Sequence, residues 1–225
     1  MHYILPSKTK ALSIRAGHLA RQLILDEGLQ AQHVDIIPGA AGGPKGLGLQ
    51  GLDQAIFDEF LPQYQMRRYL VGSSIGSWRF ASILAWGATQ GTKRLAHFYT
   101  HMNFQKGMNF ADISSVCNDM LNQLILGKEQ QIVHHPDYHL TIMAVKSRHV
   151  FNSDHRLPLL ASVAGIVASN TIKRRASKAF MQRVVVQPQH TQPLTLHTEK
   201  DFITHYHDLT PENLKIGRAS CRERV

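Results

Sequence analysis

The residues best suited to chemistry form the segment Gly72-Ser-Ser-Ile-Gly76, a Gly-x-Ser-x-Gly pentapeptide centred on Ser74. The apolar residues 70–71 before it predict the end of a buried strand, and residues 77–86 predict a helix with large apolar groups on one face. A serine on such a strand-to-helix turn exposes its hydroxyl, and the flanking glycines are needed because side chains there would collide with neighbouring backbone. The positive end of the helix favours negative charge on a substrate oxygen. The alternative is a glycine- and serine-rich turn without chemistry.

A second candidate site lies some thirty residues upstream of this turn. The β-branched segment 33–38 predicts a short strand, and the glycine-rich segment 39–48, the glycine loop, follows it. The apolar spacing of residues 49–60 then predicts a helix whose inward face carries Leu49, Leu52, Ile56 and Phe60. This order describes an anion cradle, because backbone N–H groups converge where no Cβ blocks close approach.

Glycine loops between a strand and a helix bind three kinds of anion, and each can be compared with the residues of this loop. A nucleoside triphosphate requires Gly-Lys-Ser/Thr, but Pro44 and Gly46 flank Lys45, which excludes it. A dinucleotide requires an acidic residue at the end of a second strand, whereas Asp58 and Glu59 fall inside the predicted helix. The third anion is the tetrahedral oxyanion that a nearby serine generates. The presence of both segments in one chain favours this third interpretation.

The order strand, Gly-Gly-x-Lys-Gly loop, helix, strand, Gly-x-Ser-x-Gly and helix resembles the patatin-like phospholipases over residues 33–213. The resemblance implies an α/β fold with three α/β/α layers around a mainly parallel sheet. It also implies hydrolysis of phospholipid or related acyl esters by a Ser–Asp dyad, without a cofactor and without a catalytic histidine.

The resemblance also implies a role for individual residues. Ser74 would be the nucleophile, flanked by the elbow glycines Gly72 and Gly76. The N–H groups of Gly42 and Gly43 would form the oxyanion hole, and the last glycine of that loop is Gly46. Two further positions of the loop can be compared with the family: it usually has glycine at the position of Ala41, and often Lys or Arg at that of Lys45.

The base is where the chain departs from the family. The family's dyad aspartate stands in an Asp-Gly-Gly or Asp-Gly-Ala motif, and this chain has no Asp-Gly dipeptide. Thr210-Pro-Glu predicts a helix beginning at Pro211, but the apolar pattern stops at once. We therefore expect an incomplete acyl hydrolase domain over residues 1–216, a non-native or disordered tail over 217–225, and a dyad aspartate that is not in this chain. The alternatives are a natural basic tail and a catalytically incomplete lipid- or anion-binding domain.

Composition and charge restrict the partners. The chain is 43% hydrophobic and 18% charged, as in soluble globular proteins, and its formal net charge is +9. The basic residues are scattered and no recognition motif accompanies them, so nucleic acid is not expected as a partner. Peripheral contact with an anionic membrane surface is expected instead. The apolar segment 157–168 is too short to span a bilayer and predicts a buried helix. The absence of a secretory signal and the two cysteines fit the cytoplasm.

The fourteen histidines do not indicate a metal site, because neither cysteine nor carboxylate completes the sets His134-His135-His139 and His205-x-His207. A triad drawing on His149, His190 or His205 stays open. If the two loops serve one reaction, their functional groups should converge on a single point. No carboxylate should then reach Ser74 from Asp154, Asp201 or Asp208.

The remaining pattern alternates helices with strands. A helix is predicted over residues 9–27, packed across the sheet edge, and further helices between 91 and 126. Strands are predicted at about 139–146 and 183–187. This alternation favours a mainly parallel sheet covered on both faces.

Overall fold

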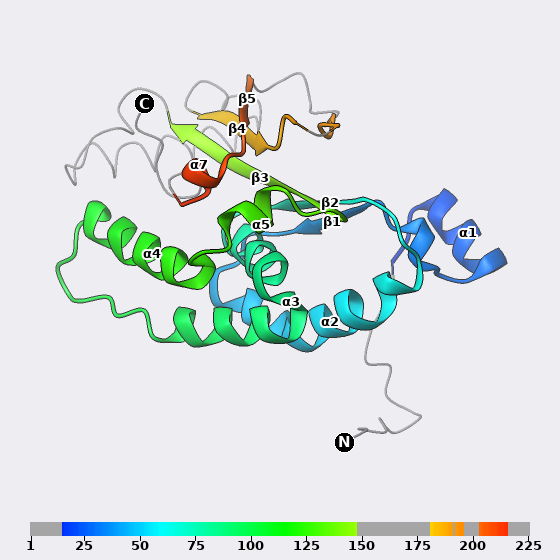
Figure 1. The fold of residues 1–225 in the computed structure, drawn as a ribbon, viewed down its shortest axis with the longest axis horizontal. Helices are drawn as coiled ribbons and strands as arrows, with labels where there is room; N and C mark the ends of the chain where they lie inside the picture. Colours follow the sequence, from blue (N-terminus) through cyan, green and yellow to red (C-terminus); the bar gives the residue numbers. More distant parts are fainter. Residues whose placement is uncertain (1–14, 148–180, 191, 196–202, 216–225) are drawn as a thin grey trace, which may run out of the picture.

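The computed structural model describes residues 15–147, 181–190, 192–195 and 203–215 (Figure 1). Within these ranges the chain forms one five-stranded sheet whose spatial order follows the sequence. The strands are β1 (Ile36–Gly39), β2 (Arg68–Gly72), β3 (Tyr138–Ser147), β4 (Met181–Gln187) and β5 (Thr204–Asp208). The α-helices are α1 (His18–Glu27), α2 (Gln50–Gln54), α3 (Ile75–Thr100), α4 (Phe110–Ile125), α5 (Glu129–Val133) and α7 (Pro211–Lys215).

The sheet is mostly parallel, as the sequence predicted. β1 pairs with β2, β2 with β3 and β4 with β5 in parallel, whereas β3 and β4 run antiparallel. The parallel neighbours β1 and β2 are joined by a crossover that contains a helix, which is the connection parallel strands require. It consists of η2 (Gly43–Leu49), α2, η3 (Ala55–Phe60) and η4 (Leu61–Gln63). The expected α/β class is therefore confirmed.

Helix α3 is the centre of the packing. All its residues from Ile75 to Ala85 are buried, and helices α2, α3 and α4 lie on the same side of the sheet (Figure 1). The helix breaks at Gly87, which has φ 75° and ψ 164°, and its second half folds back on the first. Gly91 touches the carbonyl oxygen of Ser82 so closely that a Cβ has no room. The segment 157–168, which the sequence predicted to be a helix, lies outside the described residues.

The first helix is shorter and more exposed than predicted. It begins at His18, because Gly17 is extended with φ −64° and ψ 166°, and residues 9–14 lie outside the described ranges. None of its residues is buried, and Leu19 is 80% exposed. The expectation that this helix packs across the sheet edge was therefore wrong for its described part.

The helix after the glycine loop also differs from the prediction. It begins as a 3-10 turn at Gly43, inside the segment expected to be loop, and continues through α2 into the π-helical η3. Leu49 and Leu52 are more than one third exposed, while Asp53 and Phe57 are buried in their place. The polar Asp53 can be buried here because Arg79 of α3 provides an opposite charge.

The predicted helix start at Pro211 is confirmed. The Thr210 hydroxyl accepts a hydrogen bond from the N–H of Asn213, and the Asn213 side-chain oxygen accepts one from the N–H of Thr210. These reciprocal bonds satisfy two donors at the start of the helix. Helix α7 extends to Lys215, and the tail 217–225 lies outside the described residues. Among the helices that the structure describes, none combines the length and apolar character needed to cross a membrane.

Candidate active site

The two segments singled out in the sequence follow neighbouring parallel strands. Gly39 at the end of β1 stands opposite Gly72 at the end of β2. The two segments stay together beyond the sheet, because the N–H of Ser73 donates a hydrogen bond to the Gly39 carbonyl over 3.0 Å. Both segments therefore leave the sheet at the carboxyl ends of adjacent strands, where open α/β sheets bind ligands.

Ser74 occupies a strained turn between β2 and α3. Its backbone has φ 52° and ψ −126°, and it is the single non-glycine residue with positive φ in the described part of the chain. Such a conformation costs on the order of 1–3 kcal/mol and persists only where the surrounding structure imposes it. The residue is half-buried, and its side chain does not cap the helix. The turn formed by residues 72–76, the elbow, therefore has the position between a strand and a helix that the sequence predicted.

The glycines of the elbow allow close backbone contact. A Cβ on Gly72 would lie 2.6 Å from the backbone of Ser77, and one on Gly76 would overlap the Gly39 carbonyl. The first contact makes the turn sharp, and the second brings α3 against β1. Both glycines therefore have the steric role that the sequence predicted.

The glycine loop touches the elbow directly. A Cβ on Gly46 would lie 2.8 Å from Cγ1 of Ile75, the residue after Ser74. Gly43 has φ +55°, a conformation that favours glycine. In the ranges described, neither the Gly42 N–H nor the Gly43 N–H has an acceptor. The structure thus places two unpaired backbone donors in the loop that contacts the elbow.

Within the described residues, none of the groups considered as the base for Ser74 hydrogen-bonds to its hydroxyl. Asp154, Asp201 and His149 belong to the undescribed residues. Asp208 accepts a hydrogen bond from the N–H of Gln189, and His190 pairs with His134 at 3.0 Å. Across residues 15–147 and the shorter described ranges, no side chain hydrogen-bonds to the Ser74 hydroxyl, including that of the exposed Lys45 and of His205. The same residues contain no group of three or more potential metal ligands.

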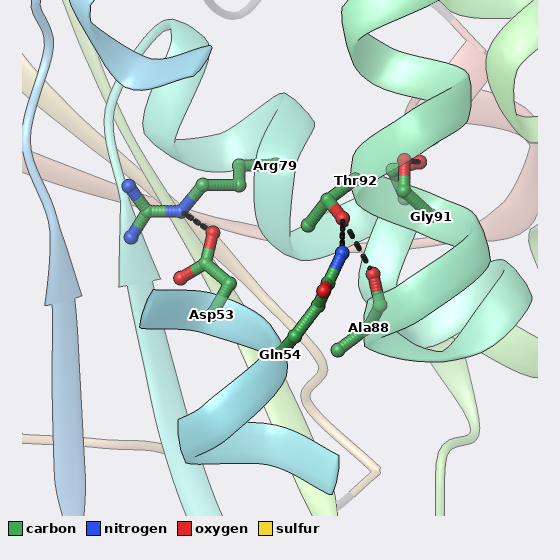
Figure 2. A network of polar contacts seen from close by, with 7 residues as sticks. Asp53, Gln54, Arg79, Ala88, Gly91 and Thr92 are labelled. Atoms are coloured by element: carbon green, nitrogen blue, oxygen red, sulfur yellow. Dashed lines mark hydrogen bonds and ion pairs between the residues drawn. The ribbon is translucent and has the colours of Figure 1, made fainter. Parts of the chain in front are cut away.

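A buried ion pair joins the helices behind the two loops (Figure 2). Arg79 Nε lies 3.0 Å from Asp53 Oδ2, and both side chains are less than a tenth exposed. The N–H and the carboxylate do not meet the geometry of a hydrogen bond, so the contact is an ion pair. Burial raises the pKa of Asp53 to about 6, an effect that the Arg79 guanidinium opposes. The hydropathy pattern gave no sign of this pair, because the two residues are polar positions on separate predicted helices.

The same two helices share a second polar contact. Gln54 Nε2 donates to the Thr92 hydroxyl over 3.2 Å, and that hydroxyl donates to the Ala88 carbonyl over 2.8 Å (Figure 2). The first bond reaches the second half of α3, whereas the ion pair reaches the first half. Helix α2, which follows the glycine loop, is therefore held against both halves of the helix that follows Ser74.

Comparison of the chain with models of known protein families, with curated proteins and with solved structures gave no match in any of the three.

Proposed function

We propose that this chain is a serine acyl-ester hydrolase domain of the patatin-like type, with the three-layer α/β/α arrangement of that family. The observation that carries the proposal is the strained backbone of Ser74, a half-buried residue on the turn that contacts a glycine loop with two unpaired N–H groups. Strain at a serine between a parallel strand and a helix is typical of a nucleophile and has no evident structural benefit.

The proposed reaction proceeds in two steps. The Ser74 oxygen bonds to the acyl carbonyl carbon while its proton passes to a base, and the carbonyl π electrons move onto the oxygen. The N–H groups of Gly42 and Gly43 stabilise this oxyanion. Collapse expels the alcohol, which takes up the proton, and leaves an acyl-serine that water then hydrolyses. We place the base, an aspartate, outside this chain.

The proposed substrate is a phospholipid or a related lipid ester, met at an anionic membrane surface on the cytoplasmic side. The resemblance to patatin-like phospholipases supports a lipid ester as the substrate, and the net charge of +9 supports contact with an anionic membrane surface. Lys45 is exposed in the glycine loop, where its ammonium group would be available to a substrate phosphate.

A fluorophosphonate probe, which labels activated serines, tests the proposal. We define the extended chain as residues 1–216 followed by the residues that the genomic coding sequence encodes after Ile216. We expect it to be labelled, Ser74→Ala to abolish the labelling, and the matched variant Ser73→Ala of the neighbouring serine to retain it. Labelling that survives in Ser74→Ala, or its absence from the extended chain, would overturn the proposal.

The second candidate function is a catalytically incomplete lipid- or anion-binding domain. It is favoured by the finding that no base contacts Ser74 within the described residues. An oxyanion hole alone still supports some rate over water, so the 225-residue chain should turn over a p-nitrophenyl ester slowly. Turnover by this chain as fast as by the extended chain would exclude the second candidate.

A further inference from the structure

The Tyr99 hydroxyl lies against the glycine loop. Its oxygen is 3.6 Å from the point where a Cβ would stand on Gly43. The Tyr99 ring packs on Trp78, with ring centroids 6.2 Å apart and the planes tilted by 52°. Trp78 lies about one helical turn beyond Ser74. Tyr99, in the second half of α3, therefore contacts both the segment with the unpaired N–H groups and the first part of α3, which begins at the elbow.

The break in α3 explains how a residue so distant in sequence reaches this place. Ser82 on the first half hydrogen-bonds to the Gly91 carbonyl on the second, over 2.8 Å. Trp78, which is nearer to Ser74, contacts Tyr99, which is nearer to the end of α3. The two halves therefore run antiparallel, so the start of the first half lies beside the end of the second. The fold-back at Gly87 brings the end of α3 to the same end of the molecule as the elbow.

Tyr99 is a hydrogen-bond donor without a partner in the described part of the chain. Its side chain is partly buried, and burial raises its pKa, with a smaller contribution from Cys117. The phenol therefore stays protonated at neutral pH and retains a donor to offer. A partly buried hydroxyl gains most from a partner that carries negative charge.

We propose that the Tyr99 hydroxyl donates a third hydrogen bond to the substrate carbonyl oxygen as that oxygen becomes an oxyanion, beside the N–H groups of Gly42 and Gly43. Tyr99 keeps its proton throughout, so the step adds no proton transfer to the reaction. This inference rests on the proposed acyl-ester hydrolysis.

The test is Tyr99→Phe in the extended chain, which removes the hydroxyl and keeps the ring on Trp78. Because the bond strengthens only in the transition state, we expect kcat to fall on the order of 10²-fold with little change in KM. The affinity for a trifluoromethyl ketone, which binds Ser74 as a tetrahedral oxyanion, should fall by the same factor as kcat/KM. Tyr206→Phe, on exposed β5, is the matched control and should leave both quantities unchanged.

The possible outcomes are distinguishable. Full activity and unchanged ketone affinity in Tyr99→Phe would refute the role of Tyr99 while leaving the hydrolase intact. A loss confined to KM, or one that parallels a lower melting temperature without a change in ketone affinity, would also refute it, because it would indicate a packing role. An extended chain without Ser74-dependent turnover would overturn the proposed function and this inference together.

Discussion

Ser74 adopts a conformation that serine disfavours, in a turn that glycine would form more easily. Its φ of 52° has no parallel among the other non-glycine residues described. Glycine adopts positive φ without steric cost, so a chain selected for stability alone would carry glycine at this position. The hydroxyl is what glycine cannot supply, which is why we assign the strain to chemistry.

Replacing Ser74 with glycine should therefore stabilise the protein. We expect Ser74→Gly to raise the free energy of unfolding by about 1 kcal/mol through relief of strain, reduced by the greater conformational entropy that glycine gives the unfolded chain. The same substitution should abolish fluorophosphonate labelling. Urea denaturation measures the first effect. Ser73→Gly is the control: Ser73 has no positive φ, so glycine should destabilise there by roughly 0.5–1 kcal/mol. Equal destabilisation by both substitutions would show that the elbow is not strained.

At this scale the sequence predicted the elbow but not its neighbours. Gly72, Ser74 and Gly76 lie within five consecutive residues, so their roles follow from a local turn that the pentapeptide encodes. Tyr99 lies far from them in sequence and approaches only because α3 folds back at Gly87. No local pattern distinguishes a tyrosine that only packs from one that also donates a hydrogen bond.

Among the secondary-structure elements, α2 and α3 determine how the two loops meet. Each follows one loop, and the ion pair between Asp53 and Arg79 connects them in the interior. A salt bridge of this kind is weak evidence for stability, because removing two charges from water costs several kcal/mol per ion. The raised pKa of Asp53 shows that burial outweighs the attraction of Arg79. We therefore expect this pair to set the relative position of the helices at a net cost.

The stability should depend on pH through Asp53. The folded chain holds the Asp53 proton more tightly than the unfolded chain, with a pKa of about 6 instead of 3.8. The unfolded state then binds fewer protons between these values, so this contribution to stability is present at low pH and is lost as the pH rises to about 6. The loss corresponds to about 3 kcal/mol.

Urea denaturation from pH 4 to pH 8 checks this prediction. The free energy of unfolding of the natural chain should fall relative to that of Asp53→Asn across the window, because the amide does not ionise. Arg79→Met removes the opposing charge and should move the window to higher pH. Parallel curves for the natural chain and Asp53→Asn would contradict a raised pKa.

Element prediction succeeded where periodicity and burial agree. The order of strands and helices in residues 33–147 follows the predicted one, and β3 and β4 lie within a few residues of the segments identified. It failed for the face of α2, where Asp53 replaces Leu52 in the interior. Hydropathy assigns a carboxylate to solvent, and only the position of Arg79 on another helix reverses that choice.

On the scale of the whole molecule, the positive charge has no single concentrated source. The net charge of +9 comes from scattered residues, and three of the arginines lie in the tail 217–225. A diffuse positive potential of this kind favours anionic surfaces over a specific partner and is screened by salt.

We accordingly expect the chain to sediment with vesicles containing anionic phosphatidylserine and not with vesicles of neutral phosphatidylcholine. Raising the salt concentration from about 0.1 M to about 1 M, which shortens the Debye length from about 10 Å to about 3 Å, should release it. The chain lacking residues 217–225 is the control and should bind more weakly but with the same lipid preference. Equal binding to both vesicles, or binding that salt does not reduce, would refute the expected surface contact.

The close approach of Gly39 to Gly76 has a consequence for how such proteins are classified. A library of variants selected only for folding, with no substrate present, should reject almost every replacement of Gly39, Gly72 or Gly76 because each would collide with backbone or ring atoms. The same library should accept changes at Gly48 and Gly51, which face open space. Under the proposed function, related chains that had lost the reaction would still retain these three glycines, since folding alone preserves them. The glycines would then identify chains that share this fold, whereas the residue at position 74 would show whether the proposed reaction is retained.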